Sequence, residues 1–418
     1  MRELRRVVVT GVGLVTSLGV GRKANWDAAI AGASGAAEIR AFEPLDTDTT
    51  IACEVRDFDP TDFMDRRVAR RMDRFAQLAV AAGRMALEDA GLSMTEANAS
   101  RAGAIVGSGI GGLRTFEEQT RIVDERGPDR VSPLFIPMVI ANMAAAQVSM
   151  VLGLKGPLSC VSTACASGNH ALGDATEAVR RGRADVMLAG GTESSITRPG
   201  IAAFNAMRAL STRNDDPAGA SRPFDASRDG FVMGEAGAIL VLESLEHAIS
   251  RGAEPLCEVL GYGLTGDAHH LTEPDPTGSA PAAAIAMALD DAGITPDRID
   301  YVNAHATSTP VGDPSEIRAL RLALGDDVAR GVAVSSTKSM HGHCLGAAGG
   351  LEGALTAMVI REGVIPPTIN LQDIDPACVG VDHVANTART ADVRIAMSSA
   401  FGFGGHNAIL VLGRLEDA

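Results

Sequence analysis

Residues 85–92 read MALEDAGL and residues 287–294 read MALDDAGI, so nearly the same octet occurs twice, about half a chain apart. Each octet is rich in helix-forming residues and has a glycine near its end, which is typical of a helix C-terminus. Each is soon followed by a short apolar run, AIVGSG (104–109) or YVNAH (301–305), that predicts a buried strand. We interpret the repeat as the trace of a duplication and expect two related α/β halves that meet around one site.

Further apolar, β-branched runs predict the rest of a large α/β body. Alanine-rich stretches of helical character lie between many of these runs, which is the pattern of sheets covered by helices. No linker rich in proline or serine separates the two halves, so we expect them to form one continuous body. The strands are expected at residues 6–13, 102–109, 184–191, 236–243, 299–305, 332–338 and 407–413.

The bulk composition excludes several classes of protein. The chain has 418 residues, of which 46% are hydrophobic and 21% charged, as in a well-buried protein of enzyme size. A net charge of −15 and an aromatic content of 3% argue against a nucleic-acid surface. Six cysteines without paired spacing predict neither a disulfide framework nor a metal site, and they suit the reducing cytoplasm.

Two apolar stretches look like targeting or membrane segments but carry too many polar residues for either. Residues 1–19 place basic residues ahead of an apolar run, yet glycine, threonine and serine interrupt that run too often for a signal peptide. Residues 136–154 contain proline, asparagine and glutamine, which favours a buried helix over a membrane span. We therefore expect a soluble protein without membrane insertion.

A single cysteine stands among small residues in VSTACASGNHALGDATEAV, residues 161–179. We expect Ser162 and Thr163 to cap a helix over residues 164–178, which would place Cys165 just inside its N-terminus. Backbone N–H groups and the helix dipole favour the thiolate at such a place, so the position suits a nucleophile. The alternative from this stretch alone is a small buried hydrophobic residue, the commoner fate of a free cysteine.

Two histidines at predicted strand ends complete a candidate constellation. His305 ends a strand in NAHATSTP, and His343 follows another in SSTKSMHGHCLGAAGG, with Lys338 five residues before it. Strand ends are where α/β proteins place reactive groups. A thiolate with two imidazoles and a cation suits thioester chemistry. Each histidine alone would more often be a structural hydrogen-bonding group, and the lysine alone a surface charge.

A glycine pattern that is typical of dinucleotide sites is weaker than it looks. Gly107, Gly109 and Gly112 have the spacing of such a loop after a strand. The residues that follow, 113–130, are charged and predict no second strand with an acidic end. We therefore discount a nicotinamide cofactor.

Six segments spread along the chain form a consistent pattern. They are VSTACASGNHAL (161–172), AMRALSTRND (206–215), RPFDASRDGFVMGEAGA (222–238), NAHATSTPVGDPSE (303–316), SSTKSMHGHCLGAAGGLE (335–352) and FGFGGHNAILV (401–411). In their sequences and in their order along the chain, these segments resemble motifs of the β-ketoacyl-[acyl-carrier-protein] synthases, and most of all those of the elongating type II enzymes. The likeness covers nearly the whole chain, which makes it highly specific.

The resemblance implies a thiolase-like α/β fold, in which duplicated βαβαβαββ halves form a five-layered αβαβα body. The halves would be residues 1–255, with the nucleophilic cysteine, and residues 256–418, with the two histidines. Together they would form one ketosynthase domain of about residues 3–416. Members are usually homodimers, and an acyl carrier protein brings their substrates on its 4′-phosphopantetheine arm, so no cofactor or metal of the synthase itself is implied.

The implied reaction is a decarboxylative Claisen condensation in fatty acid biosynthesis. Malonyl-[acyl-carrier protein] would react with an enzyme-bound acyl thioester to give a 3-oxoacyl-[acyl-carrier protein] two carbons longer. By the matching motifs, Cys165 would be the acylated nucleophile. His305 and His343 would assist malonyl decarboxylation. Lys338 would support them by its charge, and Glu316 as a structural ion-pair partner.

Further positions follow from the same motifs. The backbone N–H groups of Cys165 and Phe401 would form the oxyanion hole, and Phe401 would gate the entry of the extender unit. Ile110 would line the acyl pocket, and the threonines below would lie near the pantetheine arm. The residues expected to contact substrate are Ile110, Phe204, Thr272, Thr307 and Thr309.

The sequence departs from the usual family pattern at Ala306, His341, Ser399 and His406, where the family commonly has Gly, Thr, Asn and Thr. These departures leave the three main residues intact but leave chain length and pathway open. A specialised polyketide or nodulation-factor-type ketosynthase is therefore the main alternative. A thiolase is less expected, because its terminal glycine motif carries a second cysteine that GFGGHN lacks. The cysteine argues against a chain-length partner subunit, and the second histidine and the lysine exceed the needs of a cysteine hydrolase.

A local basic run contrasts with the acidic chain. DRRVARRMDRF, residues 65–75, spaces five arginines so that they fall on one side of a predicted helix. The ordinary role of such a run is a solvated basic face. Because acyl carrier proteins are acidic, and because the corresponding helix of similar synthases meets the carrier, we expect Arg67, Arg70 and Arg71 to form its docking site.

Overall fold

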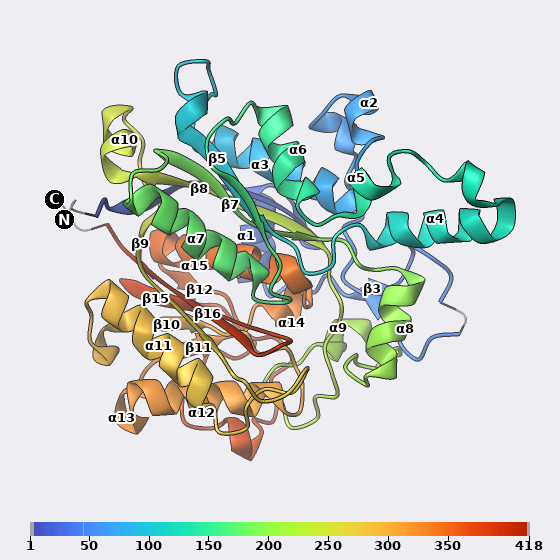
Figure 1. Cartoon of the computed structure of the whole chain (residues 1–418). Coiled ribbons are helices and arrows are strands. Elements are labelled where there is room, and N and C mark those ends of the chain that lie inside the picture. Colours follow the sequence, from blue (N-terminus) through green and yellow to red (C-terminus); the bar gives the residue numbers. More distant parts are fainter. Residues whose placement is uncertain (1–3, 45, 416–418) are drawn as a thin grey trace.

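The computed structural model describes residues 4–44 and 46–415, and these form five stacked layers (Figure 1). Two helices cover one outer face, two are enclosed between two sheet layers, and two cover the opposite outer face. From one face to the other these helices are α3 (Arg74–Asp89) and α6 (Met143–Leu152), α7 (Ser167–Arg180) and α15 (Ala348–Glu362), and α11 (Ser279–Ala292) and α12 (Gly312–Leu324). This is the expected αβαβα arrangement.

The two halves thread their strands in the same order. The first sheet layer runs β6-β5-β7-β8-β1 and the second runs β11-β10-β15-β16-β9. In both, the first three strands are parallel and the last two antiparallel to their neighbours. These strands are β1 (Val7–Thr16), β5 (Ala102–Gly107), β6 (Leu158–Val161), β7 (Val186–Glu193), β8 (Ala236–Ser244), β9 (Cys257–Gly266), β10 (Tyr301–Asn303), β11 (Ala333–Ser335), β15 (Ile395–Gly402) and β16 (His406–Gly413).

The repeated octets occupy equivalent places in the two halves. One ends α3, which follows β1, and the other ends α11, which follows β9. Gly91 and Gly293 both have left-handed backbone, with φ of 60° and 65°, and close their helices in the same way. The two layers join where β1 pairs with β9 at Val8 and Val9, so the hydrogen-bonded sheet is continuous. The predicted duplication is thus confirmed by topology.

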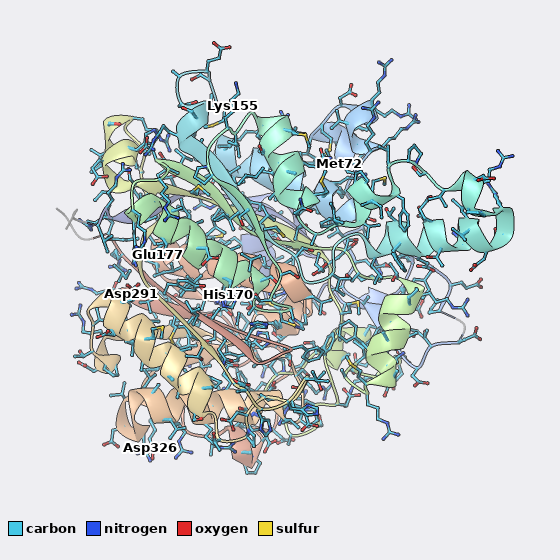
Figure 2. The ribbon with its side chains drawn as sticks, in the orientation of Figure 1. Met72, Lys155, His170, Glu177, Asp291 and Asp326 are labelled. Atoms are coloured by element: carbon cyan, nitrogen blue, oxygen red, sulfur yellow. The ribbon has the colours of Figure 1, made fainter. Side chains whose placement is uncertain are left out.

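The enclosed helices approach each other through glycine. A side-chain carbon at Gly168 of α7 would lie 2.4 Å from the backbone nitrogen of Gly350 in α15, so no larger residue fits there. Arg180, at the other end of α7, pairs with Glu177 and with Asp291 of α11, which ties the central layer to an outer one. Figure 2 labels the two carboxylates, Glu177 and Asp291. This packing lets loops from both halves converge at one end of α7.

Several sequence expectations need correction. Strands β6, β9 and β15 lie outside the predicted set, because β6 is short and half-exposed while β9 and β15 are rich in glycine, serine and alanine. The predicted helix over 136–154 is two helices, α5 (Phe135–Val139) and α6. Among the residues described here, no helix is long and apolar enough to cross a membrane.

The remaining elements are short or peripheral. Helix α4 (Leu113–Arg126) projects from one side of the body (Figure 1). The other helices are α1 (Arg22–Ile30), α2 (Arg66–Ala69), α8 (Arg198–Ala206), α9 (Pro217–Ala220), α10 (Leu245–Ser250), α13 (Asp326–Ala329) and α14 (Lys338–His341). The other strands are β2 (Gly19–Val20), β3 (Ala37–Glu38), β4 (Ile51–Ala52), β12 (Val364–Ile365), β13 (Asp382–His383) and β14 (Arg389–Thr390).

Candidate active site

Cys165 lies in a tight turn between β6 and α7. The helix begins at Ser167, so the expectation that it runs from residue 164 under a Ser162–Thr163 cap is wrong. Instead Ala164 takes left-handed backbone with φ of 50°, and the Ser167 hydroxyl accepts a hydrogen bond from the Thr163 backbone N–H at 2.9 Å. Ala164, the strained residue, directly precedes Cys165, and the side chain of Cys165 lines a cavity.

The cysteine rests as a thiol. Only 8% of Cys165 is exposed, and burial raises the pKa of its thiol to about 12, although the nearby charge of Lys338 acts in the opposite direction. Desolvation thus outweighs the cation, and the pKa shifts in the direction opposite to the one that the helix N-terminus favours. The thiol must lose its proton as the reaction proceeds.

His305 follows β10 and is fixed through its backbone. Its N–H donates to Glu316 at 2.8 Å, and the next N–H, of Ala306, donates to the other oxygen of the same carboxylate at 2.7 Å. Glu316 is buried in α12, and burial raises its pKa to about 7. Its carboxylate positions the histidine, so the predicted ion pair with Lys338 is replaced by a backbone clamp.

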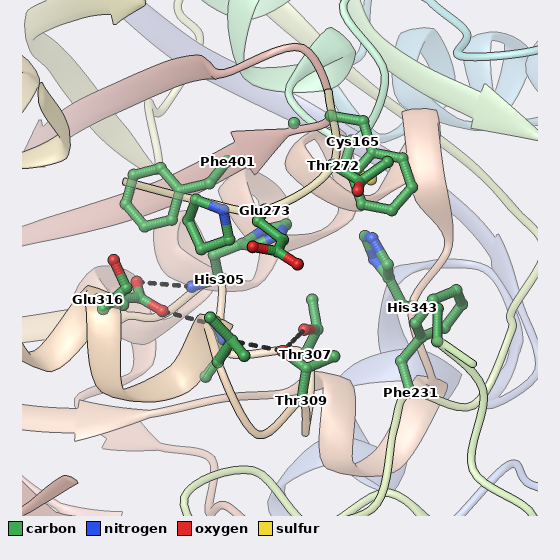
Figure 3. Close-up of a pocket in the computed structure, with 18 of the residues that line it drawn as sticks. Cys165, Phe231, Thr272, Glu273, His305, Thr307, Thr309, Glu316, His343 and Phe401 are labelled. Atoms are coloured by element: carbon green, nitrogen blue, oxygen red, sulfur yellow. Dashed lines mark hydrogen bonds between the residues drawn. The ribbon is translucent and has the colours of Figure 1, made fainter. Parts of the chain in front are cut away.

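His343 faces His305 across the cavity, as Figure 3 shows. The two ring centroids lie 5.3 Å apart, with the rings nearly perpendicular. The His343 backbone is held by hydrogen bonds to Val232 and from Gly234, of the other half of the chain. Burial and the charge of Lys338 hold the pKa of both imidazoles well below 6.5, so both are neutral at neutral pH.

The ion-pair partner of Lys338 is a residue that the sequence reasoning missed. Its ammonium lies 2.5 Å from Glu352 in α15, and both side chains are buried. Glu316 was expected in this role, but its two oxygens serve backbone N–H groups instead. A signal for Glu352 was present: it ends the quoted segment SSTKSMHGHCLGAAGGLE and lies in a helix of otherwise small and apolar residues.

The two phenylalanines of FGFGGHN, residues 401–407, have different surroundings. Phe401 still belongs to the β15–β16 ladder, where it pairs with Asn407, and its ring contacts the ring of His305 at 5.6 Å. Burial raises the pKa of the Cys165 thiol, and the backbone N–H of Phe403, in the turn two residues after Phe401, acts in the opposite direction.

One cavity of about 370 Å³ brings most of the expected residues together. Phe204, Thr272, Thr307 and Thr309 line it with Cys165, His305, His343, Glu316 and Phe401. Ile110 does not: its side chain is 41% exposed and lies outside the lining. No cluster of metal-ligating side chains occurs among the described residues.

The arginine run is not one helix. Asp65 caps α2 and Asp73 caps α3, so the chain turns at residues 70–73. Arg74 pairs with the buried Glu235 and belongs to the structure of the core, whereas the arginines at 67, 70 and 71 are exposed. The expected docking residues thus lie on the surface, though across a helix break.

His341 is the departure whose surroundings are clearest. It is fully buried in α14, with its ring nitrogens bonded to the Gly342 carbonyl at 2.8 Å and the Thr337 hydroxyl at 3.0 Å. Burial lowers its pKa to about 3, so it is a neutral structural side chain behind the site.

Comparison with known proteins assigns the family. Residues 4–248 match the model of the beta-ketoacyl synthase N-terminal domain, and residues 256–372 that of its C-terminal domain. The chain therefore belongs to the β-ketoacyl synthase family. It is 49% identical to 3-oxoacyl-[acyl-carrier-protein] synthase 2 of Synechocystis sp. over 99% of both chains. It is 48% identical to the enzyme of that name from Coxiella burnetii, over 99% of this chain and 100% of that one.

Solved structures agree with this fold. The ishigamide ketosynthase/chain length factor matches with a TM-score of 0.92 and 37% identity, over 99% of this chain and 100% of that one. A type II polyketide ketosynthase solved with its acyl-carrier protein (AntDE:AntF) matches with a TM-score of 0.91 and 34% identity, over the same shares. The thiolase-like architecture expected from the sequence is thereby confirmed.

Proposed function

We propose that this chain catalyses the elongating condensation of fatty acid synthesis. It transfers an acyl group to Cys165 and joins it to a two-carbon unit from malonyl-[acyl-carrier protein]. The observation that carries the proposal is the meeting of Cys165, His305 and His343 in one cavity, with the buried cation Lys338 behind them. The names of relatives that are 46–49% identical over nearly their full length support the same reaction.

The first half-reaction is thioester exchange. The Cys165 sulfur attacks the acyl thioester, the bond between acyl carbon and carrier sulfur breaks, and the carrier leaves as a thiol. Because the Cys165 thiol starts protonated, its proton is lost as the sulfur attacks and ends on the departing carrier sulfur. The backbone N–H groups of Cys165 and Phe401, the pair that the family motifs imply, would stabilise the oxyanion that forms in between.

The second half-reaction is decarboxylation followed by carbon–carbon bond formation. We propose the neutral tautomer with the proton on Nε2 for His305 and His343, whose Nδ1 atoms are buried and have no hydrogen-bond partner among the described residues. Two Nε2–H donors stabilise the enolate as the malonyl carboxylate leaves as CO2. The resulting carbanion attacks the Cys165 thioester, and the Cys165 sulfur leaves as a thiolate beside Lys338.

An acyl carrier protein is the proposed partner, and its 4′-phosphopantetheine carries both substrates, so the synthase needs no cofactor of its own. The exposed Arg67, Arg70 and Arg71 offer positive charge to an acidic carrier on a chain whose net charge is −15. A ketosynthase that is 34% identical has been solved together with its carrier.

A homodimer is proposed from the free edge of the first sheet. Strand β6 ends that layer, and Leu158 on it is 49% exposed. Exposed apolar side chains continue from this edge across α4, α5 and α6, and an edge strand with such a face is what an antiparallel second copy covers. These side chains are Ile110, Phe116, Ile136, Ile140, Met150 and Leu158.

A specialised polyketide ketosynthase remains the second candidate, because structural neighbours of that kind match at 34% and 37% identity. The fatty acid enzymes are favoured by their higher identity of 46–49%. The test is reconstitution: the purified protein, an acyl carrier charged with a saturated acyl group and malonyl carrier are combined. The proposal predicts CO2 and a 3-oxoacyl carrier two carbons longer, and no product with Cys165→Ala. Failure with saturated acyl groups, but turnover of a 3-oxoacyl starter, would favour the polyketide alternative.

A further inference from the structure

A buried carboxylate that the mechanism does not use lies at the end of β7. Glu193 is fully buried, and burial raises its pKa while backbone N–H groups lower it. Among the described residues, no lysine or arginine lies within ion-pair distance of it, so its charge is met by hydrogen-bond donors alone. These donors are the Ser108 hydroxyl (3.1 Å), the Gly109 N–H (2.7 Å), the Ile110 N–H (3.3 Å), the Gly111 N–H (3.3 Å), the Ser195 hydroxyl (3.4 Å) and the Gly346 N–H (3.2 Å).

The donors come from both halves of the chain. The loop after β5 supplies four of them, and Gly346, which follows the histidine segment of the other half, supplies one. The two segments touch directly over the carboxylate: a side-chain carbon at Gly346 would lie 2.3 Å from the Gly109 nitrogen and 2.7 Å from the Glu193 carboxylate. Glu193 therefore joins the two halves at this point.

The residue beside Gly346 is held in an unfavourable conformation. Leu345 has φ of 48°, a left-handed backbone that is unfavourable for a residue with a side chain. Its side chain is buried, packs in one cluster with Cys165 and lines the cavity. Something must hold that backbone in place, and the hydrogen bond from Gly346 to Glu193 acts on the next residue.

His343 is anchored by other contacts. Its N–H donates to Val232 and its carbonyl accepts from Gly234, at 2.7 Å and 2.9 Å. A change at Glu193 would thus act on Leu345 and the loop at 108–111 before it acted on the histidine. A change at Glu193 should therefore slow acyl transfer to Cys165 more than it slows decarboxylation.

We propose that Glu193 is a positioning residue for acyl transfer: by clamping Gly346 and the 108–111 loop, it fixes Leu345 as the wall against which a long acyl chain lies beside Cys165. This inference rests on the proposed function, since it concerns the acyl group that Cys165 accepts. It assigns chain-length selectivity to a residue that does not itself line the cavity.

The test compares Glu193→Gln with the unaltered protein. Glutamine has nearly the same volume as glutamate, but its NH2 group replaces one carboxylate oxygen and faces backbone N–H groups as a second donor. The hydrogen bonds that hold Gly346 and the 108–111 loop are therefore weakened. Acylation of Cys165 by a long-chain acyl carrier, followed by intact mass, should slow by roughly ten-fold, and acylation by an acetyl carrier by less than about two-fold. CO2 release from malonyl carrier, measured after Cys165 is fully acetylated, should stay within about two-fold. Equal slowing with both acyl groups, no slowing, or a parallel loss of CO2 release would each overturn the proposal.

Two further variants complete the design. Glycine at position 345 tolerates the left-handed backbone, and Leu345→Gly removes the wall. This variant should therefore lower the ratio of long-chain to acetyl acylation rates, as Glu193→Gln does. An unchanged ratio overturns the proposal even if Glu193→Gln fails to fold. Glu243→Gln is the matched control, because Glu243 is also a buried sheet carboxylate but bonds Thr10 and Arg251, outside the cavity lining. Its ratio should equal that of the unaltered protein. If the unaltered protein is not acylated at all, the proposed function fails instead.

Discussion

The ion pair between Lys338 and Glu352 supplies the fixed charge of the site. Both side chains are buried, and the lysine lowers the pKa of both catalytic imidazoles. Replacing Glu352 by Gln leaves a buried, uncompensated ammonium, so we expect the free energy of unfolding to fall by about 3–5 kcal/mol in denaturant titrations. The exposed pair Lys23–Asp27 is the control, and Asp27→Asn should change it by less than about 0.5 kcal/mol. A similar small effect at Glu352 would show that the lysine is not charged in the folded protein.

The neutral histidines predict a particular pH dependence. An ordinary imidazole would gain a proton near its usual pKa of 6.5, but burial and Lys338 place the pKa of His305 and His343 well below that value. Protonation of these histidines should therefore cause no loss of CO2 release between about pH 8 and about pH 6 in enzyme already acylated at Cys165. Because these histidines protonate at a higher pH in the unfolded chain than in the folded one, their own contribution to stability should fall as the pH drops below about 6.5, whereas Glu316, with its raised pKa of about 7, contributes in the opposite direction. A loss of CO2 release with a midpoint near 6.5 would contradict the neutral assignment.

At the scale of residues, the sequence predicted those site residues that belong to a recognisable local motif. Cys165, His305 and His343 each lie beside a turn that their own neighbours specify, and the structure brings all three to one cavity. It failed for Glu352, whose role depends on which atoms of distant segments meet. The carboxylate of Glu316 and that of Glu352 look equivalent in sequence, and only packing decides that the first clamps backbone and the second pairs with Lys338.

At the scale of elements, the turn between α2 and α3 decides which arginines are available to a carrier. Arg67 and Arg71 are exposed, whereas Arg74 is tied to Glu235. The double variant Arg67→Glu/Arg71→Glu should raise KM for acyl carrier substrates by roughly ten-fold and weaken its dependence on salt, because the patch acts on encounter. Turnover of small acyl-pantetheine thioesters should stay nearly unchanged. Equal losses on both kinds of substrate would show that these arginines maintain the fold.

A control with the same change of charge is available elsewhere on the surface. Arg330 and Arg361 are exposed; Arg330 directly follows α13 and Arg361 lies in α15, both outside the α2 region. Arg330→Glu/Arg361→Glu should leave KM for the carrier within about two-fold at physiological salt, where screening limits the reach of surface charge.

The boundaries of elements were harder to predict than their existence. Periodicity placed an arginine-rich helix over residues 65–75, but the helix that Asp65 caps ends at Ala69, and Asp73 caps a second helix. The same type of error placed the start of α7 before Cys165, because alanine-rich sequence continues through the turn. In both cases a capping or turn geometry overrides helix propensity, and the side-chain hydrogen bonds that signal it are set by the folded chain.

At the scale of the whole molecule, the open edge at β6 predicts assembly. Leu158→Glu puts a charge into the apolar face proposed to meet a second copy, so it should convert a dimer into monomers in sedimentation experiments. Leu322→Glu is the matched control, since Leu322 on α12 is exposed to 58% and lies away from that edge. A protein that is monomeric without any change, or a dimer that survives Leu158→Glu, would contradict the proposed interface.

The repeat of one octet was enough to predict the duplicated architecture, because the same helix end follows the first strand of each half. The edge and linking strands escaped prediction for a physical reason. β6 is only half-buried, and β9 and β15 are filled with small residues that let α7, α11 and α15 pack closely, so none carries the apolar pattern of an ordinary strand.

The most direct test of the central claim is the mass of the cysteine-containing peptide during a single turnover. The protein is mixed with a saturated acyl carrier, digested and analysed, and then malonyl carrier is added. The account predicts that the peptide containing Cys165 gains the mass of one acyl group, while peptides with the other five cysteines do not. On addition of malonyl carrier this acyl group should leave Cys165 and reappear on the carrier, extended by two carbons. An acyl group found on another residue, or one that is released as free acid without extension, would contradict the assignment of this chain as a condensing enzyme.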